Sequence, residues 1–268
     1  KKLLLKVLLL EKKHAKACYN LGRIFSIEEN YKEAKKYLIH ALEIDPKYPK
    51  AHFLLARAYE TFESHVEAKA HYGHAIESHP DFALAHFRLG VRLFEEGSAT
   101  EAEEHLRQSI SLESQNSEAH YYLAMILRTD DDPSLAKKHF FRALEINPEF
   151  ALAYYELAHH SEKNGDLNEA KIHFQKATDI EQNFVEAYFH LARISTNPSE
   201  YDQAFRNYET ALEIDPQMAE CHYWFGKLLT TGEKLKNDGT LVWEPDPMRA
   251  EEHFRKAIKI NPKYSNAY

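Results

Sequence analysis

The sequence contains 17 histidines, and histidine is the side chain that most often binds transition metals and changes charge near neutral pH. Nine of them fall in two columns that follow a 34-residue period: His52, His86, His120 and His222 in the first, and His71, His105, His139, His173 and His253 in the second. Equivalent helices of stacked repeats lie roughly 10 Å apart, whereas a zinc–nitrogen bond is about 2.1 Å long. A single ion therefore does not bridge a column.

Two other histidine pairs are close in sequence. His71 and His74 are one helical turn apart, and His159 and His160 are adjacent, but neither pair has an evident third ligand. We therefore predict structural or surface histidines and no metal site. If the first-column histidines are buried in the neutral form, the stability of the fold should depend on pH.

Motifs of the common enzyme classes do not occur in the sequence. It has no glycine-rich phosphate loop, no HExxH and no GxSxG. The two cysteines, Cys18 and Cys221, form no CxxC or metal-ligand spacing. We expect no catalytic residues, no cofactor and no enzymatic activity.

Composition indicates a folded, mainly helical protein. The 268 residues are 44% hydrophobic and 28% charged, with only 8 Gly and 10 Pro. The net charge of -8 argues against a nucleic-acid binder, which needs a surplus of Lys and Arg. The longest apolar run, near the start of the chain, is too short to span a membrane. We expect a cytoplasmic protein.

The helices that carry these residues repeat seven times. One column is Leu in six copies and Phe in the seventh, and the residue after it is always Gly or Ala: Gly22, Ala56, Gly90, Ala124, Ala158, Ala192 and Gly226. A second small column is Ala throughout, and a bulky column lies four residues beyond it: Leu38, Tyr72, Leu106, Phe140, Phe174, Tyr208 and Phe254. Small residues let two antiparallel helices approach closely, and the bulky ones fill the gaps beside them. Each unit is predicted to be a helical hairpin.

Prolines end most units, because proline cannot continue a helix. The preceding residue is Asp or Asn in the motifs ALEIDP, ALEINP and AIKINP, and His at His79-Pro80. Repeats three and five have Ser114 and Gln182 in place of this proline, which predicts a weaker stop. Asp246-Pro247 and the similar Asp132-Pro133 pair an N-cap acceptor with proline at the first helical position and predict helix starts.

These columns resemble the tetratricopeptide repeat, and the resemblance covers essentially the whole chain. It implies an all-α fold, a right-handed α-solenoid superhelix of antiparallel helix pairs. The predicted repeats are 15–48, 49–82, 83–116, 117–150, 151–184, 185–218 and 219–264. Residues 1–12 are expected to be the second helix of a partial repeat rather than a signal peptide, and 265–268 the start of a further repeat. We interpret 1–268 as one array cut from a longer one, with self-association through its ends as a further expectation.

The resemblance also implies that the first helix of each hairpin lines a concave groove. Residues that flank the Leu column are the candidate partner-binding residues: Arg23, Arg57, Arg88, Tyr122, His159, Arg193, Trp224 and Lys227. A column that runs Lys16, Lys50, Leu84, Glu118, Leu152, Glu186 and Glu220 changes from basic to acidic. We predict that the basic end holds a partner with acidic residues, against the alternative of a solvated face with no binding role.

An aromatic column precedes each Leu by two residues: Tyr19, Phe53, Phe87, Tyr121, Tyr155, Phe189 and Tyr223. We interpret it as packing between repeats, with peptide anchoring as the alternative.

Residues 230–247 insert twelve residues into the last repeat. Asn237 to Thr240 suits a tight turn and Leu241 to Trp243 a short strand. Leu241 and Trp243 either pack against the neighbouring repeat or anchor a partner.

The function predicted from these features is a non-catalytic scaffold or adaptor that binds a peptide segment or partner domain in the groove, without nucleic acid or a membrane span. The alternative is a substrate-recruiting repeat region of a larger multidomain enzyme such as a glycosyltransferase.

Overall fold

The computed structural model describes residues 1–11, 13–128, 133–195, 197–231 and 245–267. Over these residues the secondary structure consists of 15 α-helices and two 3-10 helices, with no strand. The predicted turn and strand of the insertion, with Leu241 and Trp243, lie outside the described residues.

Contacts divide the chain into two compact units, Lys1–Ile146 and Asn147–Tyr268. The amino-terminal unit holds α1 (Lys2–Leu10), α2 (Ala15–Ile27), α3 (Tyr31–Ile44), α4 (Pro49–Glu60), α5 (His65–Ser78), α6 (Ala83–Glu95), α7 (Ala99–Leu112), α8 (Ser117–Leu127) and α9 (Pro133–Ile146). The carboxy-terminal unit holds α10 (Ala151–Lys163), α11 (Leu167–Ile180), α12 (Val185–Ile194), η1 (Pro198–Glu200), α13 (Tyr201–Ile214), α14 (Ala219–Thr230), α15 (Pro247–Ile260) and η2 (Pro262–Ala267). That one array runs through both units remains a prediction.

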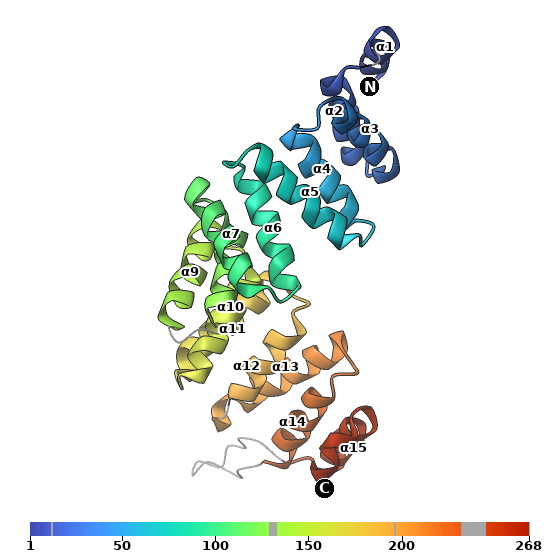
Figure 1. Ribbon diagram of the computed structural model, residues 1–268. Helices are drawn as coiled ribbons and strands as arrows, with labels where there is room; N and C mark the ends of the chain where they lie inside the picture. The colour runs from blue at the N-terminus through green and yellow to red at the C-terminus, as the bar shows by residue number, and fades with distance from the viewer. Residues whose placement is uncertain (12, 129–132, 196, 232–244, 268) are drawn as a thin grey trace. The chain divides into compact units, whose positions relative to one another are not determined.

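Within each unit the helices pack as hairpins, and each hairpin packs on the next (Figure 1). The first helix of a pair contacts the second, as in α2 with α3 or α10 with α11, and the second contacts the first helix of the following pair. First helices also contact each other, as α2 does α4 and α6 does α8. The all-α solenoid predicted from the columns is therefore confirmed.

Every second helix is 14 residues long, from α3 to α15. In repeats three and five, for which we predict a weaker stop, α7 and α11 end in the same register as the helices followed by proline. Packing against the next hairpin fixes these ends without proline. The predicted cap at Asp246 is confirmed, because its carboxylate accepts a 3.0 Å hydrogen bond from the backbone N–H of Arg249.

In four hairpins the turn between the two helices repeats with the period of the sequence. Glu29, Glu63, Gly97 and Gly165 all have positive φ, between 54° and 83°. Equivalent positions thus adopt the left-handed conformation whether or not the residue is glycine, although glycine adopts it with the least strain. In these four turns the backbone repeats although the residue type changes.

The core consists of the predicted columns. The bulky column is fully buried from Leu38 to Tyr208 and half-buried at Phe254. The aromatic column is buried at Phe53, Phe87, Tyr121 and Phe189 and half-buried at its other positions, which agrees with its interpretation as packing. The small residues after the Leu column let the two helices of a hairpin meet closely.

Replacing Gly90 with valine should therefore destabilise the chain by about 1–3 kcal/mol, because its new side chain overpacks the hairpin. A Cβ at Gly90 would lie 2.9 Å from Cγ of Leu106 and 3.2 Å from the carbonyl oxygen of Ala102. Gly73 is the matched control, since a Cβ there meets nothing within 4 Å. Urea unfolding of Gly90→Val and Gly73→Val measures the difference, and equal stabilities would contradict this account of the small column.

Candidate functional site

The two histidine columns meet inside the hairpins. His52, His86, His120 and His222 on first helices are buried, and each contacts a histidine on the second helix of the same hairpin. The Nδ1–Nδ1 distances are 2.9 Å for His52–His71, 2.9 Å for His86–His105, 2.9 Å for His120–His139 and 2.8 Å for His222–His253. Among the described residues this pair is therefore a repeated internal feature of four hairpins.

Backbone carbonyls determine the proton positions in these pairs. Nε2 of His52, His86 and His222 lies 2.9, 3.0 and 3.1 Å from the carbonyl oxygens of Pro46, Pro80 and Pro216. A carbonyl only accepts, so Nε2–H is the donor and the Nδ1 of the same ring accepts from the second histidine. In these three hairpins the Nδ1–Nδ1 contact is then a hydrogen bond between two neutral rings.

The sequence predicted structural histidines but not their pairing. A constant separation of 19 residues in three hairpins was the available signal. In the last hairpin the separation is 31, which exceeds 19 by the length of the insertion.

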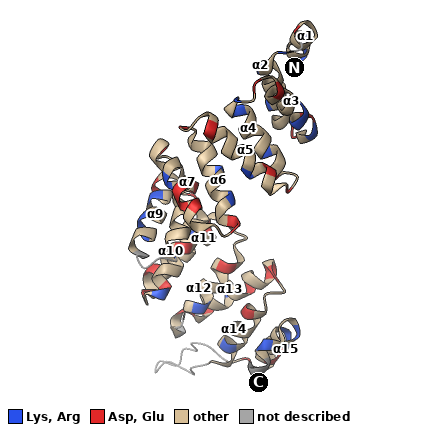
Figure 2. Cartoon of the chain, viewed as in Figure 1, with Lys and Arg blue, Asp and Glu red and all other residues tan. Residues whose placement is uncertain are grey.

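The candidate binding residues of the amino-terminal unit lie on the first helices α2, α4, α6 and α8. Arg23 and Arg57 are exposed, and Arg88 and Tyr122 are half-buried. The guanidinium of Arg88 lies over the ring of Phe87, 5.3 Å from its centroid. Lys and Arg are interspersed with Asp and Glu along the helices (Figure 2).

The column that changes sign is exposed at all seven positions from Lys16 to Glu220. Its two lysines border a cavity of about 500 Å³ lined by Lys16, Tyr48, Pro49, Lys50, His79 and Phe82. The cavity thus combines aromatic walls with two ammonium groups.

In the carboxy-terminal unit the candidate binding residues contact other side chains of the same chain. Lys227 is exposed, with Nζ 5.4 Å from the ring centroid of Tyr223 and 5.0 Å from that of Trp224. Trp224 is half-buried and packs against the core. Arg193, predicted as a groove cation, instead has a carboxylate partner in the adjacent hairpin.

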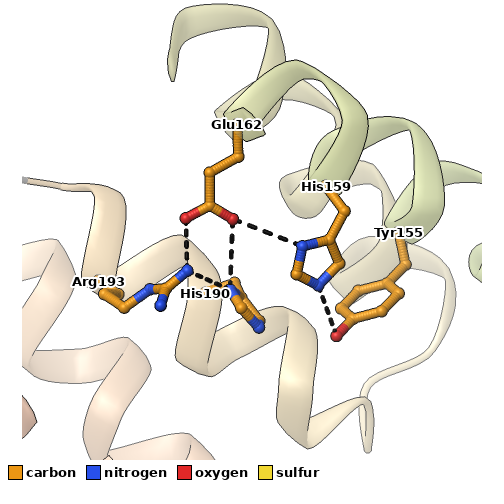
Figure 3. Close-up of polar contacts among 5 residues, drawn as sticks. All are labelled: Tyr155, His159, Glu162, His190 and Arg193. Carbon is orange, nitrogen blue, oxygen red and sulfur yellow. Dashed lines mark hydrogen bonds and ion pairs between the residues drawn. The ribbon is translucent and has the colours of Figure 1, made fainter. Parts of the chain in front are cut away.

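That partner belongs to a polar cluster between α10 and α12 (Figure 3). Tyr155, His159 and Glu162 lie at spacings of four and three on α10, and His190 and Arg193 at a spacing of three on α12, so each helix presents its residues on one face. Two of these residues were predicted to contact a partner, and the other three were not.

Distances within the cluster fall into two classes. Arg193 Nη2 lies 2.5 Å from Oε1 of Glu162 and 3.0 Å from Nδ1 of His190, and Nε2 of His159 lies 2.9 Å from the hydroxyl of Tyr155. Oε2 of Glu162 is farther from the imidazoles, 3.6 Å from Nδ1 of His159 and 3.4 Å from Nδ1 of His190. The side chains of Glu162 and His190 are 16% and 14% exposed, so the cluster is sheltered but reachable.

Burial and neighbouring charges shift the pKa values of this cluster. Burial, reinforced by His190, lowers the pKa of His159 to about 4. Burial alone would raise the pKa of Glu162, but the neighbouring His190 and the charge of Arg193 outweigh it and lower that pKa. At neutral pH the cluster therefore holds a carboxylate, a guanidinium and a neutral His159.

The structure corrects the prediction that His159 lacks further ligands. Potential ligand atoms of His159, Glu162 and His190 all lie within 4.8 Å of one another. The sequence argument compared residues within a helix or within one column, whereas these residues belong to different columns of neighbouring hairpins. A separation of 31 residues, from Glu162 to Arg193, was the signal of a cross-hairpin contact.

Comparison with protein families gives matches to two tetratricopeptide repeat models, one at residues 15–48, 151–184 and 185–218 and the other at residues 67–117. The chain belongs to the tetratricopeptide repeat family. Such repeats form protein-interaction scaffolds. Comparison with curated protein sequences gives no match.

Solved structures share this tetratricopeptide fold at low identity. YrrB, described as a TPR protein with an unusual peptide-binding site, is 22% identical with a TM-score of 0.60, over 69% of this chain and 95% of its own. Pseudomonas aeruginosa pilF is 22% identical with a TM-score of 0.71, over 80% and 97%. The APC/C hetero-tetramer Cut9-Hcn1 includes a chain that is 18% identical with a TM-score of 0.66, and the match spans 84% of this chain but only 45% of that one.

None of the helices in the described part of the chain has the length and apolar character needed to cross a bilayer.

Proposed function

We propose that this tetratricopeptide chain binds an acidic peptide segment along the first helices of its amino-terminal unit. The observation that carries the proposal is the exposure of basic residues at equivalent positions of successive first helices. Arg23 on α2 and Arg57 on α4 are both exposed, and both follow the Leu column by two residues. Successive first helices contact each other, so an extended segment can meet both residues in turn.

The cavity beside Lys16 and Lys50 supports the same chemistry. Its aromatic lining suits the apolar part of a side chain, and its two ammonium groups attract a carboxylate. The net charge of the chain is -8, so this local surplus of positive charge contrasts with the rest of the molecule and would orient an acidic partner. The peptide-binding site described for YrrB is a precedent within the same fold.

A triple charge reversal tests the proposal. Selection of a displayed random-peptide library on the full chain should enrich acidic peptides. Arg23→Glu, Arg57→Glu and Arg88→Glu together should then weaken binding of the enriched peptide by at least about tenfold at low salt, because attraction becomes repulsion. Fluorescence anisotropy of the labelled peptide measures the affinity, and added salt should reduce the difference.

The matched control reverses three cations on second helices of the same unit, Lys32, Arg107 and Lys138, all of which are exposed. This variant should bind the peptide like the unmodified chain. Equal losses in both variants, or enrichment of basic peptides, would contradict the proposal.

A further inference from the structure

The polar cluster between α10 and α12 presents three potential metal ligands from two neighbouring hairpins. They are Nδ1 of His159, Oε2 of Glu162 and Nδ1 of His190, and all lie within 4.8 Å of one another. Two imidazoles and a carboxylate are a ligand set that proteins use for zinc.

The separations suit an ion better than they suit hydrogen bonds. Charge-assisted N–H···O hydrogen bonds are about 2.7–2.9 Å long, whereas Oε2 of Glu162 lies 3.6 and 3.4 Å from the two imidazole nitrogens. Ligand atoms about 2.1 Å from a tetrahedral ion are about 3.4 Å from each other. The distances from the carboxylate oxygen to the two imidazole nitrogens are therefore close to the distance between two ligand atoms of a tetrahedral site.

The hydrogen bonds around the cluster place a lone pair on the Nδ1 atom of each imidazole. Nδ1 of His190 is 3.0 Å from Nη2 of Arg193, which can only donate, so this nitrogen carries a lone pair. Nε2 of His159 lies 2.9 Å from the hydroxyl of Tyr155, whose oxygen can accept its proton and orient the ring. Histidines that bind metals are commonly held by such a contact at the other nitrogen.

We propose that His159, Glu162 and His190 bind a divalent first-row cation of the zinc type. The three side chains supply three ligands, and the fourth position takes water or a donor atom from a bound partner. The proposal does not depend on the acidic-peptide function, which involves the other unit.

Arg193 acts as the competitor of the ion in this proposal. Its guanidinium contacts both the carboxylate of Glu162 and Nδ1 of His190, so a positive group already neutralises the ligands. A metal ion must displace these contacts, and the chain should gain affinity when the guanidinium is removed. If the cluster is only a structural ion pair, loss of Arg193 should weaken the cluster and should not increase its affinity for a metal ion.

Titration of the full chain with Zn²⁺ by calorimetry, and with Co²⁺ by visible absorption, tests the proposal. One tight site per chain and the absorption bands of tetrahedral Co²⁺ are expected. Glu162→Gln and His190→Phe, which keep size and ring packing, should each weaken zinc binding by at least about tenfold and remove the Co²⁺ bands. Arg193→Gln should strengthen binding by about tenfold.

His160→Ala is the matched control. His160 is adjacent to His159 but bonds to Asn164, with 3.0 Å between Nε2 and Nδ2. This variant should bind zinc normally, as should a variant of the His52–His71 pair. Circular dichroism without metal establishes that each variant is folded, and Glu162→Gln provides the test if His190→Phe does not fold. No tight zinc site, or a site that survives both ligand variants, would overturn the proposal, and so would weaker binding in Arg193→Gln.

Discussion

Acidification from pH 7 to pH 5 should destabilise the chain by several kcal/mol through the paired histidines. Burial lowers the pKa of His71, His139 and His253 to about 4. In the unfolded chain a histidine has its ordinary pKa of about 6.5. Below that pH the unfolded state binds protons that the folded state does not. The free energy of unfolding therefore decreases as the pH is lowered.

The geometry of the pairs explains why protonation is costly. A proton added to His52 would go to Nδ1, so two Nδ1–H groups would face each other across the 2.9 Å contact with His71. The charge would also be buried, since His52 is only 7% exposed. A proton added to His71 would go to Nε2 and would place a positive charge in the half-buried pair. Because one histidine of each pair stays neutral in the folded chain, the free energy of unfolding at pH 5 should be lower by roughly 1–2 kcal/mol per pair.

Urea unfolding between pH 7.5 and pH 5 measures the effect. A matched variant replaces the pairs by the residues that the sixth repeat carries at these positions, Tyr188 and Asn207. In that variant His52, His86 and His120 become Tyr, and His71, His105 and His139 become Asn. Its stability should depend far less on pH, and an equal pH dependence of both proteins would rule out the histidine pairs as the cause.

Truncation of Phe174 to alanine should cost about 3–5 kcal/mol, the largest effect expected of a single substitution. The side chain is fully buried, and it packs against Tyr155, His159 and His190, with ring centroids 5.7, 5.6 and 5.4 Å away. The substitution therefore removes apolar contacts and also leaves the polar cluster without one wall.

Ile172 on the same helix is the control, because it is 61% exposed. Ile172→Ala should change the stability by less than about 0.5 kcal/mol. Chemical denaturation of both variants checks the contrast. A cost below about 1 kcal/mol for Phe174→Ala would show that α11 does not hold α10 and α12 together as described.

The fold could be predicted from the sequence because each column meets nearly the same surroundings in every hairpin. Leu38 and Phe174 belong to one column, and both are fully buried although their repeats are far apart in the chain. Repetition thus averages out local exceptions, such as the missing proline after α7 and α11. A single copy of the motif would have left the period and the core face uncertain.

The candidate site could be predicted only in part. Exposure of Arg23 and Arg57 follows from their position relative to the Leu column, which the sequence gives directly. The contact of Glu162 with Arg193 joins two columns across neighbouring hairpins, and its distance of 2.5 Å depends on side-chain rotamers and helix separation. The column pattern contains neither quantity.

Hydrogen–deuterium exchange of the full chain, with and without the selected acidic peptide, tests the proposed function most directly. The account predicts that bound peptide slows exchange in the first helices α2, α4 and α6, and leaves the second helices α3, α5 and α7 unchanged. Protection of the second helices, or of residues 230–247 alone, would contradict binding along the first helices.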